Sequence, residues 1–280
     1  TTTLAVIKTE SSKKIMSIIK AFLYTFLAFV FWSIIQLAIL LPIKYFIGKP
    51  DNFTHIIGIT NNISIIGSFL IIYYFFWKPK FDLKKALRMQ NYNPKVYLYL
   101  PLIGIGLFFL NRPLLDFTKI MEYYQGIPSN YSSNTAINYI DLIYKLISTI
   151  LIAPIIEELF YRKFLLDKLL KNNSRISAII TSSICFSIMH IETPNNLIPT
   201  FISGIILGII YLKTKKICYC IMLHFIVNLI IVTTNNIGIS YDNWLIGYNF
   251  DIYYWLSFGV GIIITIIGMK KITTANTVYN

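Results

Sequence analysis

Residues Asp141 to Arg162 read Asp-Leu-Ile-Tyr-Lys-Leu-Ile-Ser-Thr-Ile-Leu-Ile-Ala-Pro-Ile-Ile-Glu-Glu-Leu-Phe-Tyr-Arg. This stretch is long and apolar enough to cross a membrane as a helix, yet it contains the adjacent carboxylates Glu157 and Glu158. A charged side chain at membrane depth costs roughly 2.5–3.5 kcal/mol on insertion scales, and such residues usually face a bundle interior or a water-filled cavity. The stretch therefore predicts a transmembrane helix that carries a functional pair of glutamates.

The composition of the chain extends this interpretation to the whole protein. The 280 residues are 56% hydrophobic and only 13% charged, whereas a soluble domain carries about 25% charged residues. A segment in lipid must satisfy its backbone hydrogen bonds internally, so the predicted fold class is all-α, a polytopic transmembrane helical bundle. The net charge of +13 comes largely from lysines between apolar runs, which indicates membrane topology and anionic headgroups as the partner rather than nucleic acid.

The apolar runs define the expected topology. Basic residues are concentrated in alternate loops, so the positive-inside rule predicts that both termini are cytoplasmic. The expected location is the plasma membrane, and the abundance of Lys, Ile and Asn fits a low-GC bacterium. We expect a single membrane domain over 1–280, with peripheral N-terminal spans in 1–140 and a catalytic core in 141–235. The eight expected spans are 17–41, 56–77, 96–110, 142–162, 176–190, 197–212, 217–234 and 252–269.

Ionisable and polar residues at helical spacing identify the candidate site. Residues four apart share a helix face, so Glu158 and Arg162 are expected to pair, while Glu157 turns toward the bundle and is available as a general base. The same spacing places Phe186 and His190 on one face of the next span. A buried Glu–Arg pair is more typical of structural support than of catalysis, and Phe186 is expected to pack against the site.

A comparison of depths predicts that these groups meet. The turn between the two spans centres near Asn173, which is 173 − 157 = 16 residues after Glu157 and 190 − 173 = 17 residues before His190. An antiparallel hairpin sets them level, roughly 9 Å inside the membrane, and His224 lies roughly 10 Å deep on a later span, with Asn228 on the same face. The segment directly after His190 then begins below the outer face, so we expect it to be extended and to line a wet cavity.

Three motifs together carry a resemblance to a known family. Glu157-Glu158-x-x-x-Arg162, Phe186-x-x-x-His190 and His224-x-x-x-Asn228 occur in the order and on the successive helices typical of the CPBP family, the CAAX proteases and bacteriocin-processing enzymes, also called Abi. The resemblance covers about residues 141–235 and implies a glutamic-type intramembrane endopeptidase, similar to the type II CAAX prenyl endopeptidases, that cleaves near the cytoplasmic face. It further implies that Glu157 and His190 activate water, that His224 and Asn228 stabilise the oxyanion, and that Glu158, Arg162 and Phe186 support them.

Alternatives follow from the same residues. Two glutamates and two histidines could hold Zn²⁺, with Glu157, His190 and His224 as ligands, but His-Glu-x-x-His spacing is missing and asparagine is a poor zinc ligand, so no cofactor is expected. A non-proteolytic scaffold or regulator could retain the same pocket, and a carrier could use the carboxylates, although no inverted repeat is found. The expected partner is a peptide or protein substrate at the membrane: a prenylated CAAX protein, a leader peptide or a membrane-protein tail.

Overall fold

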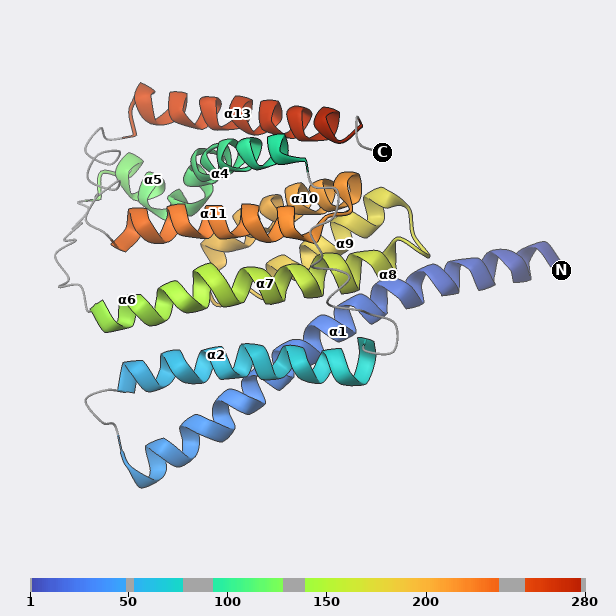
Figure 1. Ribbon diagram of the computed structural model, residues 1–280, viewed down its shortest axis with the longest axis horizontal. Helices are drawn as coiled ribbons and strands as arrows, with labels where there is room; N and C mark the ends of the chain where they lie inside the picture. The colour runs from blue at the N-terminus through green and yellow to red at the C-terminus, as the bar shows by residue number, and fades with distance from the viewer. Residues whose placement is uncertain (1, 49–52, 78–92, 128–138, 237–249, 278–280) are drawn as a thin grey trace.

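The computed structural model describes residues 2–48, 53–77, 93–127, 139–236 and 250–277. Within these ranges every regular element is a helix and none is a strand, which confirms the predicted all-α class. The long helices lie alongside one another as a bundle, and the first helix begins at the same end of the bundle as the last helix ends (Figure 1). The two ends coincide when the chain crosses the bundle an even number of times. The side of the membrane on which that end lies stays a prediction.

The helices correspond to the expected spans and add a short amphipathic helix, α5, that hydropathy did not indicate. One chain segment combines several helical registers, and it is the one that carries the two glutamates. The elements are α1 (Thr2–Phe46), α2 (Phe53–Ile72) with η1 (Tyr73–Trp77), α4 (Pro94–Leu115), α5 (Phe117–Tyr124), α6 (Tyr139–Leu146), η3 (Ile147–Ile152), α7 (Ala153–Glu158), η4 (Leu159–Leu166), α8 (Asp167–Leu169), α9 (Arg175–Ile188), η5 (Pro194–Asn196), α10 (Leu197–Thr214), α11 (Ile217–Asn236) and α13 (Ile252–Thr277).

Six helices in the described ranges are long and apolar enough to cross a membrane. All eight predicted segments are helical, but two of them do not meet this standard: the composite segment from α6 to α8, which contains the charged residues, and α9, which has only 14 residues. The six are Ile18–Phe46, His55–Trp77, Pro94–Leu115, Pro194–Thr214, Ile217–Thr234 and Ile252–Ala275.

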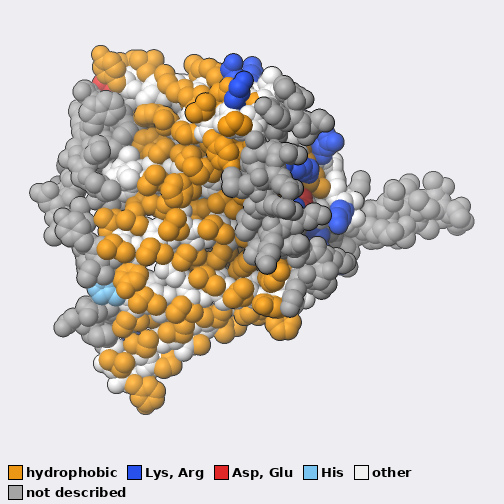
Figure 2. Space-filling view, viewed as in Figure 1, with side chains coloured by type: hydrophobic (Ala, Val, Ile, Leu, Met, Phe, Trp, Pro, Cys, Tyr) orange, Lys and Arg blue, Asp and Glu red, His pale blue; other side chains and the backbone are white. Residues whose placement is uncertain are grey.

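The outer surface has the character expected of a lipid-facing bundle. Large apolar side chains such as Phe26, Ile34 and Ile263 are more than half exposed. Hydrophobic side chains cover most of the visible face, and the described lysines and arginines gather toward the end at which the chain begins (Figure 2). Because water would oppose such exposure, this face is built to contact lipid.

Small residues bring α4 and α13 close together at one side of the bundle. A Cβ atom on Gly261 would lie 2.7 Å from the backbone nitrogen of Leu110, and one on Gly106 would lie 2.4 Å from the Oγ1 atom of Thr265. Glycine at these positions therefore allows the two backbones to approach directly, which is the usual basis of tight helix packing in membranes.

The first hairpin covers the opposite side. Helices α1 and α2 pack on each other, and α2 also contacts α6, η3 and α7 of the composite segment (Figure 1). The Ser68 hydroxyl of α2 donates a hydrogen bond to the Ala28 carbonyl of α1 at 2.7 Å, which fixes the two helices against each other. This packing places α2 beside the helix that carries Glu157.

Candidate active site

Four polar side chains from three chain segments line one cavity of ≈350 Å³ in the interior of the bundle. Glu157 comes from α7, His190 from the turn after α9, and His224 and Asn228 from successive turns of α11. The structure therefore brings together the four residues proposed from the sequence, at a depth where three apolar segments surround them. Their catalytic roles are a separate matter and stay predictions.

The segment that carries the glutamates owes its shape to a change of helical register. In η3 the backbone bonds span five residues, and the Ala153 N–H donates to the Ser148 carbonyl. The next donor in this register would be residue 154, but proline has no N–H, so the Thr149 carbonyl has no backbone donor there. Asn228 supplies one instead, because its Nδ2 donates to the Thr149 oxygen at 2.7 Å. This bond fixes the Asn228 amide at the edge of the cavity.

Glu158 is the fully buried member of the glutamate pair. Its Oε2 lies 3.1 Å from Nε of Arg162, and its Oε1 lies 3.0 Å from Nδ1 of His224. The structure thus contains the expected Glu158–Arg162 ion pair and adds a bond to the histidine that the sequence did not indicate. A carboxylate in such a place is tolerated because both of its oxygens face cationic or hydrogen-bonding groups.

Phe186 packs at the centre of the site. Its ring centroid lies 5.2 Å from that of His190 and 5.7 Å from that of His224, in edge-to-face geometry. The guanidinium carbon of Arg162 lies 4.8 Å from the same centroid. Within the described ranges the two terminal nitrogens of Arg162 have no hydrogen-bond partner, so the aromatic face is the neighbour that compensates their charge.

Hydrogen bonds determine how each histidine faces the cavity. Nδ1 of His190 lies 3.1 Å from the Phe186 carbonyl oxygen, which can only accept, so Nδ1 carries the proton and Nε2 is left as an acceptor. Nδ1 of His224 donates to Glu158, and its Nε2 lies 3.8 Å from Oε2 of Glu157. That Glu157 oxygen has no hydrogen-bond partner among the described residues. Both imidazoles therefore present Nε2, and Glu157 presents an uncommitted carboxylate oxygen.

The segment after His190 corrects one expectation. It is not extended but forms tight turns, with the Thr193 N–H donating to the His190 carbonyl at 2.9 Å and the Asn196 N–H donating to the Thr193 carbonyl at 2.8 Å. Local bonds of this kind satisfy the backbone inside the bundle, which an extended chain could not do alone. The expectation that this segment lines cavities holds, since Glu192 and Asn196 both do so.

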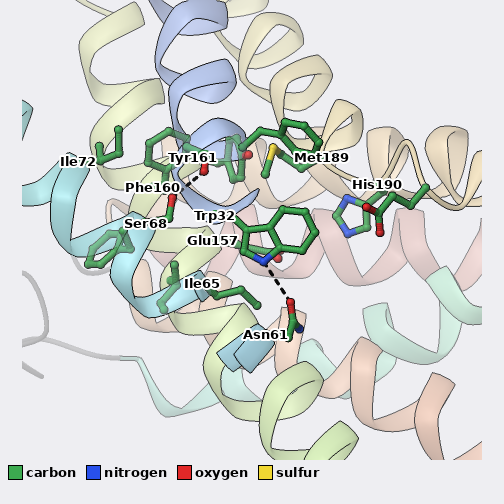
Figure 3. Close-up of a pocket in the computed structure, with 15 residues that line it drawn as sticks. Trp32, Asn61, Ile65, Ser68, Ile72, Glu157, Phe160, Tyr161, Met189 and His190 are labelled. Atoms are coloured by element: carbon green, nitrogen blue, oxygen red, sulfur yellow. Dashed lines mark hydrogen bonds between the residues drawn. The ribbon is translucent and has the colours of Figure 1, made fainter. Parts of the chain in front are cut away.

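Two further residues near the site lie outside the motifs. Asn61 of α2 and Trp32 of α1 line a cavity of ≈280 Å³ that also contains Glu157 and His190 (Figure 3). The Trp32 indole N–H donates to Oδ1 of Asn61 at 3.0 Å. The signal available in the sequence was a polar Asn61-Asn62 pair inside an apolar run, which by itself does not indicate where either side chain points.

The three residues considered as zinc ligands do not form a ready metal site. No group of three or more His, Cys, Asp or Glu side chains in the described ranges is arranged to hold a metal ion. No chemical step is therefore derived through a metal, and the metal dependence of any activity stays a prediction.

Comparisons with known proteins agree with the resemblance drawn from the motifs. Residues 139–230 match a family model described as "Type II CAAX prenyl endopeptidase Rce1-like", and this range contains all seven motif residues. The chain is also 25% identical over 215 residues, 74% of its length and 85% of the relative's, to a Bacillus subtilis (strain 168) protein named "Putative membrane peptidase YdiL". No solved structure gives a significant match. The predicted family resemblance is confirmed over residues 139–230.

Proposed function

We propose that this multi-pass membrane protein is an intramembrane endopeptidase, because residues 139–230 match the model of the type II CAAX prenyl endopeptidases, Rce1-like. The observation that carries the proposal is the convergence of Glu157, His190, His224 and Asn228 on one cavity. Hydrolysis of a peptide bond needs a base for water and donors for the oxyanion, and this set offers both.

The first step is activation of water between Glu157 and His190. Glu157 takes a proton from the water as its oxygen attacks the carbonyl carbon of the scissile bond. Nε2 of His190 accepts a hydrogen bond from the same water and orients it, because its Nδ1 proton is held by the Phe186 carbonyl. Glu157 is suited to the role of base since one of its oxygens has no hydrogen-bond partner among the described residues.

The second step is stabilisation of the tetrahedral oxyanion. Asn228 contributes the second N–H of an amide whose first N–H is bonded to Thr149. We assign His224 an Nε2–H that faces the oxyanion, in addition to the Nδ1–H that it donates to Glu158 at 3.0 Å, so the mechanism uses the imidazole with a proton on each nitrogen. The intermediate collapses when the C–N bond breaks and Glu157 returns its proton to the leaving amine. Arg162 holds Glu158 in place throughout, through the contact between its Nε and Oε2 of Glu158.

The substrate class follows from the setting of the cavity. A peptide that reaches Glu157 must enter a bundle whose outer surface is apolar, so the substrate is a protein tail or leader peptide held at the bilayer. By the positive-inside rule, the basic end of the bundle supports a reaction near the cytoplasmic face of the plasma membrane. The family name favours a prenylated C-terminal CAAX sequence as the first class to test.

The proposal is tested with a matched pair of variants. Membranes from cells that produce the native chain, Glu157→Gln or Glu122→Gln are compared for released peptides by mass spectrometry. Glu122 is an exposed acidic residue on α5 and serves as the control. We expect the native chain and Glu122→Gln to release the same peptides and Glu157→Gln to release none of them.

Purified protein provides the direct measurement. An internally quenched peptide copied from the observed cleavage junction, and a farnesylated CAAX peptide, should be cleaved by the native chain and not by Glu157→Gln. Equal peptide sets from all three membranes, together with no cleavage of either probe, would contradict the proposal and favour a non-proteolytic scaffold that retains the pocket.

A further inference from the structure

We propose that Asn61, contributed by the first hairpin, is a substrate-positioning residue that donates a hydrogen bond from Nδ2 to a backbone carbonyl of the bound peptide. The inference rests on the proposed endopeptidase function and assigns part of the substrate site to helices outside residues 139–230. It gives α1 and α2 a role in binding, with Trp32 as the residue that orients Asn61.

The position of Asn61 is the first observation. Three cavities, of ≈280, ≈660 and ≈350 Å³, are lined in part by Asn61, so this residue lies where they adjoin. Two of the three also contain both Glu157 and His190. A peptide that extends from the scissile bond into these spaces passes the Asn61 side chain, which in Figure 3 lies beside Trp32 at the rim of the pocket that Glu157 and His190 line.

The orientation of the Asn61 amide is the second observation. An indole N–H can only donate, so the atom of Asn61 that lies 3.0 Å from Nε1 of Trp32 is the oxygen. This bond fixes which end of the amide is Nδ2 and leaves two N–H donors on it. Among the described residues none accepts a hydrogen bond from Nδ2, so the donors are available to a ligand in the cavity.

The chemistry of the walls selects the ligand class. Around Asn61 the ≈280 Å³ cavity is mainly apolar, with Phe29, Ile65, Phe69 and Ile156 among its lining residues. An uncharged amide donor in such surroundings is matched by an uncharged acceptor, and the acceptor that every peptide repeats is its backbone carbonyl. The apolar walls then accommodate the side chains on either side of that carbonyl.

A purely structural role for Asn61 would not explain the free donors. The bond from Trp32 joins α1 to α2, but these helices are already joined by the Ser68–Ala28 hydrogen bond and by their packing. The structural link uses only Oδ1. Substitutions that keep the oxygen and remove the nitrogen therefore separate the two roles.

The experiment uses four single variants of the full chain, one double variant, and the quenched peptide that the native chain cleaves. Asn61→Asp keeps an oxygen acceptor for Trp32 and removes the donor, while Asn61→Leu removes both. Trp32→Phe keeps an aromatic ring and releases the amide to rotate. Asn62→Leu is the matched control, because Asn62 is the neighbouring asparagine on α2 and lines none of the three cavities.

We expect KM to rise by about threefold to tenfold in Asn61→Asp and Asn61→Leu, with kcat within about twofold of native, the loss that one neutral hydrogen bond to substrate produces. Trp32→Phe should raise KM less, and should raise it no further when combined with Asn61→Leu. Asn62→Leu should match the native chain. If Asn61→Asp folds and retains the native KM, Asn61 is structural and the inference is wrong.

Different results would overturn the endopeptidase function and the role of Asn61. If the native chain cleaves neither the junction peptide nor the farnesylated peptide, the endopeptidase function fails and the inference fails with it. If the native chain cleaves a peptide and both Asn61 variants keep its KM, only the inference is overturned. If Asn61→Asp does not insert in the membrane, Asn61→Leu is compared with Trp32→Phe, which loses the same Trp32–Asn61 bond but keeps the amide donors. The inference is overturned if the two variants raise KM equally.

Discussion

Replacing Pro154 with alanine should impair catalysis without weakening the fold. The Thr149 carbonyl accepts from Asn228 because the Ala153 N–H is used by Ser148 and Pro154 has no N–H to give. Alanine at 154 supplies the missing donor, or lets η3 relax to the ordinary register in which the Ala153 N–H reaches Thr149. In both cases a backbone N–H competes with Asn228 for the Thr149 carbonyl, and the Asn228 amide is released from it.

The size of the effect follows from the bond that is lost. One hydrogen bond of this kind is worth about 0.5–1.5 kcal/mol, which at about 1.36 kcal/mol per tenfold corresponds to a fall in kcat of roughly twofold to twelvefold. Complete removal of the donor, in Asn228→Ala, should cost about 10²–10³ in kcat, as for other oxyanion donors. Because alanine suits a helix interior better than proline, the thermal midpoint of Pro154→Ala should not fall.

The assay is a double-mutant cycle on kcat with the junction peptide. If Pro154 acts through Asn228, Pro154→Ala should cause no further loss in the Asn228→Ala background. Pro101→Ala is the control, because Pro101 also lies inside a membrane helix, α4, but lines none of the cavities described above. The reasoning is refuted if Pro154→Ala lowers kcat by the same factor with and without Asn228, or does not lower it at all.

Three other outcomes are expected. Glu157→Gln should abolish turnover with the thermal midpoint unchanged. Glu158→Gln should lower the thermal midpoint, because it leaves Arg162 buried without its ion pair. If Glu158→Gln abolishes turnover in a stable protein and Glu157→Gln does not, the roles of the two glutamates are exchanged. Peptide cleavage should survive exhaustive chelation, and a loss that added Zn²⁺ restores, with stoichiometric zinc in the active protein, would establish a metal mechanism instead. Gly261→Leu should destabilise the protein by about 1–3 kcal/mol, because the new side chain meets the α4 backbone. Gly259→Leu is the control, since its side chain meets open space and should leave the thermal midpoint near native. Equal midpoints for the two variants would contradict the tight α4–α13 contact.

The features of the fold that hydropathy and helical spacing control could be predicted from the sequence. The apolar runs gave the helices, and the spacing of four placed Glu158 against Arg162. The depth comparison placed Glu157, His190 and His224 in one cavity, although they come from different segments. These predictions succeed because each depends on the residue spacing within one helix or on the number of residues that connect two neighbouring helices.

Features that depend on long-range contacts could not be predicted in the same way. The change to η3 has its reason in Pro154, but the carbonyl that it leaves free is satisfied by Asn228, 79 residues away along the chain. The orientation of Asn61 depends likewise on Trp32, 29 residues earlier on another helix. The turns after His190 were missed because hydropathy does not distinguish a tight turn from an extended chain. In each case the decisive partner lies outside the local pattern.

The buried guanidinium of Arg162 has a consequence for the energy of the reaction in the membrane. Arg162 forms an ion pair with Glu158, and the proposed mechanism places a doubly protonated imidazole of His224 opposite Glu157, so that two cations match the two carboxylates. When Glu157 takes the proton from water, its negative charge passes to the oxyanion, which faces the same imidazolium. Under the proposed mechanism the reaction therefore relocates a charge over a short distance inside the bundle and creates none. An apolar surrounding, which would penalise the appearance of a new ion heavily, opposes such a transfer very little.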